Sequence, residues 1–211
     1  MMSDGDRYEK AIAAFDAINA GDPNFETVGA AREPKELLYA RRMTEMLERF
    51  APDASETVRL AARCQHIRRW EIPRANYPAT PEGYKAWRTR LLDYHAEISA
   101  AVLRDCGYDE AMVASVASVV RKERLKRNPD AQLLEDVIGL VFLQHYLADF
   151  VKGHPVYDEA KYVDILQKTF RKMSSRGRHA AATLITLPGE LAAVVARAAV
   201  AAGSGSGPRT S

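Results

Sequence analysis

The chain has 211 residues, of which 47% are hydrophobic and 27% charged, and its formal net charge is +2. A chain of this length and balance can bury a full core without disulfides or a structural metal. So small a net charge gives no overall attraction to nucleic acid, and no apolar run is long enough to span a bilayer. No signal peptide is expected, and Cys64 and Cys106 are expected to be buried free thiols in the cytoplasm.

Helical periodicity dominates the chain, and strand signals are nearly absent. We expect helices over residues 6–19, 35–50, 55–72, 81–105, 109–126, 128–152 and 158–173, and a last helical region interrupted at Pro188-Gly189. A short polar loop is expected after Pro23. The sequence therefore predicts an all-α fold, a compact multi-helix bundle. It would form a single domain over residues 1–202, followed by a disordered Gly/Ser tail over residues 203–211.

Between the third and fourth expected helices, prolines at positions 73, 78 and 81 exclude a helix. Loops carry function disproportionately, so this segment is expected to line the mouth of a polar site. Basic and aromatic side chains gather in and before it. They are Arg68, Arg69, Trp70, Arg74 and Tyr77.

Four ionisable residues fall on, or at the border of, apolar helix faces. They are His66, His95, Glu123 and Asp136, one in each of four consecutive expected helices. Burying a charge without a partner is costly, so we expect these side chains to converge on one polar site. Two imidazoles and two carboxylates are also a suitable ligand set for a divalent metal ion.

Each of these residues also has a purely structural explanation. A histidine on an apolar face commonly bonds a backbone carbonyl, Glu123 could pair with a neighbouring arginine, and Asp136 could favour a helix dipole. These alternatives stay open on the sequence alone.

Parts of the chain resemble two known protein families. Residues 60–67, His95 to Ile98, Val116 to Glu123 and Leu133 to Val141 resemble the metal-binding segments of the HD-domain phosphohydrolases. The chain reads Gln65-His66-Ile67 where that family has its His-Asp pair. The runs 35–39, 66–74 and 134–137 also look like an uncharacterised bacterial and fungal family, whose members are sometimes labelled glutamyl-tRNA synthetase. No synthetase signature supports that label.

Two functions from different classes are therefore expected. In the first, a divergent HD-domain-like phosphohydrolase acts on a small phosphorylated or nucleotide substrate, and His66, His95, Glu123 and Asp136 hold a divalent metal. Lys122 would act on the phosphate, Glu135 would orient a ligand, and the basic and aromatic residues before the fourth helix would bind substrate. In the second, a non-catalytic helical module uses the same arginines to bind an anionic ligand or RNA. No membrane partner is expected, and the oligomeric state stays open.

Overall fold

The computed structural model describes residues 4–203, and the tail predicted for residues 203–211 lies almost wholly outside them. Ten α-helices and one two-stranded sheet make up the described part, so the prediction of an all-α fold is confirmed. No helix in this part is both long and apolar enough to cross a membrane. Contacts divide the chain into two compact units, Met1–Leu134 and Glu135–Ser211, and each is described by itself.

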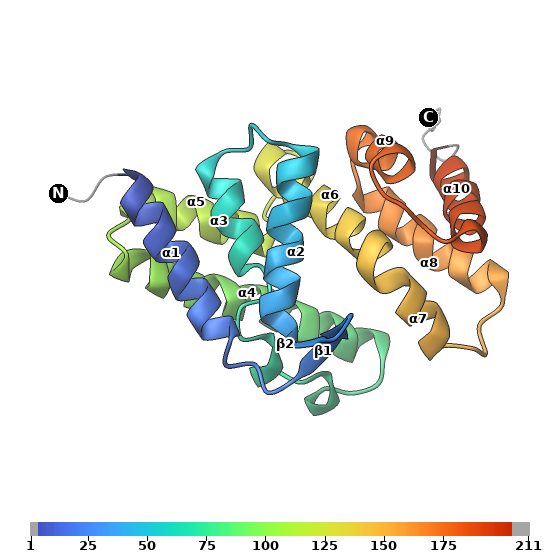
Figure 1. Cartoon of the computed structure of the whole chain (residues 1–211), viewed down its shortest axis with the longest axis horizontal. Helices are drawn as coiled ribbons and strands as arrows, with labels where there is room; N and C mark the ends of the chain where they lie inside the picture. The colour runs from blue at the N-terminus through green and yellow to red at the C-terminus, as the bar shows by residue number, and fades with distance from the viewer. Residues whose placement is uncertain (1–3, 204–211) are drawn as a thin grey trace. The chain divides into compact units, whose positions relative to one another are not determined.

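The first unit contains the helices that position the histidines. Its elements are α1 (Asp4–Asn19), β1 (Phe25–Val28), β2 (Ala31–Pro34), α2 (Lys35–Phe50), α3 (Glu56–Cys64), η1 (Arg69–Glu71), η2 (Arg74–Asn76), α4 (Pro81–Asp105), α5 (Glu110–Arg121) and the start of α6 (Pro129–Val141). Figure 1 shows α1, α2 and α3 side by side, in blue to cyan, and these helices contact one another. Helix α5 packs on both α3 and α4, so the core of the unit lies between these helices.

Short polar side chains begin several of these helices. Ser55 accepts a hydrogen bond from the Val58 amide at the start of α3, and Asp109 does the same for the Met112 amide at α5. Such caps satisfy amides that have no partner within the helix. They fix the start of each helix, and with it the face that each presents to the core.

Two helices end earlier than predicted. Helix α3 stops at Cys64 rather than residue 72, and Arg68 then takes a left-handed conformation with φ 51°. Helix α5 stops at Arg121 rather than residue 126, because Lys122 is also left-handed, with φ 59°. A left-handed residue cannot continue a right-handed helix. Both ends fall beside residues that the sequence had marked as functional.

The polar loop expected after Pro23 contains a small antiparallel hairpin instead. Phe25 pairs with Pro34 and Val28 with Ala31, around a turn in which Gly29 has φ 60°. Each strand has only four residues, too few for a clear alternating pattern. Ion pairs from α2 hold the hairpin, including one of 2.5 Å between Arg42 and Glu26.

The second unit continues from α6 through the π-helical segment η3 (Phe142–Tyr146) into α7 (Leu147–Gly153). It is completed by α8 (Glu159–Lys172), α9 (Ser175–Thr183) and α10 (Gly189–Gly203). Helices α8 and α10 pack against each other, and Leu166 and Phe170 of α8 are buried. This unit therefore has apolar residues of its own to bury.

Candidate functional site

The two predicted histidines lie beside each other in the first unit. His66 stands in the turn that leaves α3, and His95 lies on the buried face of α4 between Leu91 and Ser99. Their ring centroids are 5.8 Å apart, with the planes tilted by 38°. Because α3 ends at Cys64, the turn that follows it contacts α4, where the Ile67 carbonyl bonds His95.

His95 has one ring nitrogen that is satisfied and one that is not. The side chain is 1% exposed, and Nδ1 lies 2.7 Å from the Ile67 carbonyl oxygen. Since a carbonyl can only accept, Nδ1 carries the proton and Nε2 keeps a lone pair. Nε2 is buried and has no hydrogen-bond partner among the described residues. Burial, followed by the nearby His66, lowers the pKa of His95 to about 3, so the ring is neutral near pH 7.

His66 is held in the same tautomer by a different acceptor. Its Nδ1 lies 3.2 Å from a carboxylate oxygen of Glu36, and its ring stacks on Tyr39 with centroids 4.0 Å apart. Burial is the main cause that lowers the pKa of His66 well below its usual value. Nearby cations act in the same direction: Arg69, Arg88, Lys122 and Lys35. His66 is therefore neutral as well, and its Nδ1–H donates to Glu36.

Glu36 is the central residue that the sequence reasoning missed. The residue is 5% exposed, one carboxylate oxygen faces His66, and the other lies 3.8 Å from Nε of Arg69. Burial raises the pKa of Glu36, and Arg69 opposes that shift. A signal was present, because Glu36 precedes Ala40 and Met43 on the buried stripe of α2.

Two further polar residues complete the cluster. The Tyr39 hydroxyl donates to the amide oxygen of Gln65 over 3.0 Å, and Gln65 is 3% exposed. Gln65 thus fixes the tyrosine on which His66 stacks.

The charge around the histidines is mainly positive. Arg69 pairs with Glu36, and its guanidinium also lies 4.9 Å from the centre of the Trp87 ring. Arg88, Lys122 and Lys35 all act on His66 electrostatically, whereas the carboxylate of Glu36 acts on His95 in the opposite direction. An excess of cations beside neutral imidazoles favours an anionic ligand.

The loop arginines have structural partners. Arg74 donates to the carbonyl oxygens of Tyr77 and Pro78, each over 2.7 Å. Arg68 lies 3.8 Å from Glu71, and Trp70 is half-buried in η1. Arg69 is thus the loop arginine that contacts the histidine cluster, through Glu36.

The structure corrects the position expected for Glu123. The sequence placed its side chain on the buried stripe of α5, but the helix ends before it, and Glu123 is exposed. The valines that precede it in α5, up to Val120, are buried. Lys122, at the left-handed end of the helix, is half-buried.

Asp136 and Glu135 belong to the second unit, and both are buried. The oxygens of Asp136 accept hydrogen bonds from the backbone amide of Ser174 over 2.7 Å and from its hydroxyl over 2.5 Å. Ser174 in turn caps α9 by accepting from the Gly177 amide. Asp136 therefore anchors the start of α9, where a negative charge is also favoured by the helix dipole.

The metal prediction can be compared with this geometry. Among the residues that the structure describes, no group of three or more His, Cys, Asp or Glu side chains is arranged to hold a metal ion. His66 and His95 do offer two imidazoles prepared in the ligand tautomer. The four-residue ligand set stays a prediction.

The described chain is thus an α-helical protein whose first unit holds two adjacent neutral histidines, a buried His95 and a half-buried His66, in positive surroundings. It belongs to the family described as "Domain of unknown function (DUF4202)", whose profile matches residues 9–195. Comparisons with the curated proteins and with the solved structures found no match.

Proposed function

We propose that the first unit binds a small phosphorylated molecule at the cluster formed by Glu36, His66, Arg69 and His95, and that the protein hydrolyses it with a divalent metal ion, as in the HD-domain resemblance. The observation that carries the proposal is the unpartnered Nε2 of His95. A buried polar atom without a partner costs free energy, so such atoms call for an occupant.

The imidazoles suit a metal ion. Proteins prepare histidine ligands by bonding the other ring nitrogen to a carbonyl or a carboxylate, as Ile67 and Glu36 do here. A bound metal ion would lower the pKa of a water molecule and polarise a phosphoryl oxygen. Two protein nitrogens leave coordination positions for water and for a phosphate oxygen.

The cations suit the phosphate. Arg69 is best placed for this role, because its guanidinium is already fixed between Glu36 and Trp87. Lys122 supports it through charge, and a catalytic role for Lys122 remains part of the proposal. Arg68 and Arg74 instead shape the loop, in keeping with their bonds to Glu71 and to backbone carbonyls.

A second candidate is a non-catalytic module that binds an anion without metal. It is favoured by the excess of cations around His66 and by the finding that no three metal-ligating side chains converge in the described residues. RNA is the larger anion of the same class, and its phosphates would meet the same cations.

Metal and phosphate binding separate these candidates. Untagged protein would be analysed for bound metals, titrated with Mn²⁺ and with inorganic phosphate by calorimetry, and assayed against nucleoside monophosphates and sugar phosphates. His95→Asn removes Nε2 but keeps a donor for the Ile67 carbonyl. Arg69→Gln tests the anion site, and Arg104→Gln, at an exposed arginine paired with Glu110, is its control.

The enzyme is supported if metal binding and hydrolysis are both lost in His95→Asn. The binding module is supported if phosphate binds without metal, weakens in Arg69→Gln and is unchanged in the control. Wild-type protein that binds neither Mn²⁺ nor phosphate would overturn both.

A further inference from the structure

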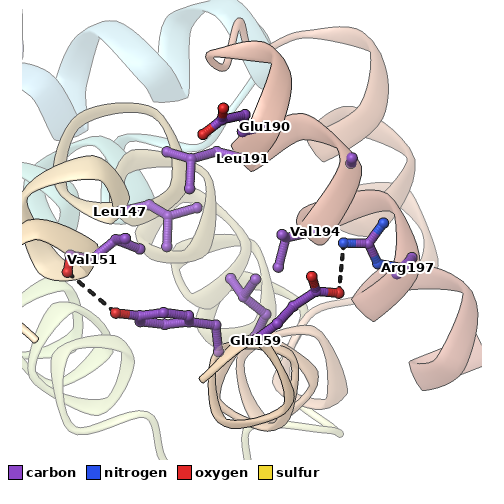
Figure 2. A pocket seen from close by; sticks show the side chains of 10 residues that line it. Leu147, Val151, Glu159, Glu190, Leu191, Val194 and Arg197 are labelled. Atoms are coloured by element: carbon purple, nitrogen blue, oxygen red, sulfur yellow. Dashed lines mark hydrogen bonds and ion pairs between the residues drawn. The ribbon is translucent and has the colours of Figure 1, made fainter. Parts of the chain in front are cut away.

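The second unit contains a pocket of about 470 Å³ that is separate from the histidine cluster in the sequence. It lies between α7, α8 and α10, as Figure 2 shows. Its apolar wall is formed by Leu147, Val151, Leu166, Leu191, Ala193 and Val194. The volume falls in the range of small-molecule sites, about 300–1,000 Å³.

The hydroxyl of Tyr162, which lines the middle of the pocket, is not available to a ligand. It is turned to the backbone, where it contacts the carbonyl oxygens of His154 over 2.6 Å and Val151 over 3.2 Å. The dashed line that starts at Val151 in Figure 2 marks the second of these bonds. The tyrosine thus presents its ring to the pocket, and the interior favours an apolar group.

The charged residues lie at two places on the rim. Arg197 of α10 pairs with Glu159 of α8 over 2.7 Å, so these two charges offset each other. Glu190 lies beyond Leu191 in Figure 2, away from that pair, and is exposed. Within the described residues Glu190 forms no ion pair. The pocket lining therefore contains one carboxylate that has no ion-pair partner in the part of the chain that the structure describes.

We propose that this pocket binds a small amphipathic amine, with its apolar body against Leu147, Leu191 and Val194 and its ammonium group against Glu190. Burial of the apolar body supplies most of the affinity. Glu190 supplies the preference for a cation, because an anionic head group would meet the uncompensated carboxylate. This site is independent of the proposed phosphate site.

A matched set of head groups tests the proposal on the full chain. Octylamine, octanol and octanoate, each below its micelle concentration, share one apolar body and differ in charge. Binding would be measured by calorimetry and by NMR shifts of the leucine and valine methyl groups. We expect octylamine to bind most tightly and octanoate least.

Three variants locate the binding. Glu190→Gln should weaken octylamine binding by up to about five-fold and leave octanol unchanged, as expected for one solvent-exposed ion pair. Glu82→Gln, at an exposed acid in the first turn of α4, is the matched control and should bind like wild type. Val194→Trp should block all three ligands, with circular dichroism to verify folding.

Other results would overturn the proposal. They are the absence of octylamine binding, tighter binding of octanoate, or an octylamine affinity that Glu190→Gln leaves unchanged. Equal binding by a folded Val194→Trp variant would place the ligand elsewhere and overturn it too.

Discussion

Acid should destabilise the first unit through His95, and His95→Asn should remove that part of the effect. In the folded protein His95 is neutral, because burial lowers its pKa to about 3. In the unfolded chain the pKa returns to about 6.5. Between these values the unfolded state binds more protons, so the free energy of unfolding falls as the pH drops below about 6.5.

The size of the effect follows from the two pKa values. Each pH unit below the unfolded pKa costs about 1.4 kcal/mol for one such group. Lowering the pH from about 7.5 to about 5.0 should therefore reduce the free energy of unfolding by about 2 kcal/mol through His95 alone. His66 acts in the same direction, since its pKa is also lowered, so the wild type should lose more than this in total.

Urea unfolding at both pH values would measure it, with a chelator present so that the imidazoles carry no metal. Both tryptophans, Trp70 and Trp87, belong to the first unit, so their fluorescence reports on that unit. Relative to wild type, His95→Asn should lose about 2 kcal/mol less between the two pH values. His179→Asn, at an exposed histidine of α9, should behave like wild type. Equal pH dependence in wild type and His95→Asn would refute the reasoning.

Three predictions concern other buried groups. Gly177→Ala should lower the free energy of unfolding by about 1–3 kcal/mol, because the added Cβ would lie 2.5 Å from Cγ of Asp136. Gly153→Ala is the control, since a Cβ added there would meet nothing within 4 Å. Equal stability of the two variants in urea would contradict this prediction. Asp136→Asn should lower stability by about 1–3 kcal/mol by weakening the bonds from Ser174, and faster hydrogen exchange in α9 would locate the loss. Burial raises the pKa of the Cys64 thiol to about 12, so Ellman's reagent should modify it only after unfolding, and rapid labelling of the native protein would show that it is accessible.

Much of the fold could be predicted because it rests on local patterns. The buried stripes of α4 and α5 repeat with helical period, so the inward position of His95 followed directly. His66 could be placed beside His95 because both bordered such stripes. The hairpin at Phe25–Pro34 was missed because its stabilising ion pairs come from α2, which no local pattern reveals.

The rest of the site could not be predicted, because it depends on the backbone conformation of single residues. Lys122 and Arg68 are left-handed although neither is glycine, so nothing in their residue types marked a helix end. Glu123 was misplaced for that reason. Glu36 was overlooked because its partners, His66 and Arg69, are some thirty residues away in the chain. Asp136 was predicted to be a metal ligand because it is a buried acid. Its partner Ser174, at the start of α9, lies 38 residues further along the chain and could not be identified from the sequence.

The segment between η1 and α4 is irregular in backbone conformation but is held in place by hydrogen bonds. Arg74 ties down the carbonyls of Tyr77 and Pro78, and the Trp87 indole donates to the Ile72 carbonyl over 2.9 Å. Gly83 lets α4 start so close that a Cβ there would lie 2.3 Å from the Pro78 carbonyl oxygen. The segment between η1 and α4 therefore loses its conformational entropy when the chain folds. Proteases cleave flexible, extended backbone, so this segment should resist limited proteolysis. A ligand that contacts the segment would bind without first having to order it.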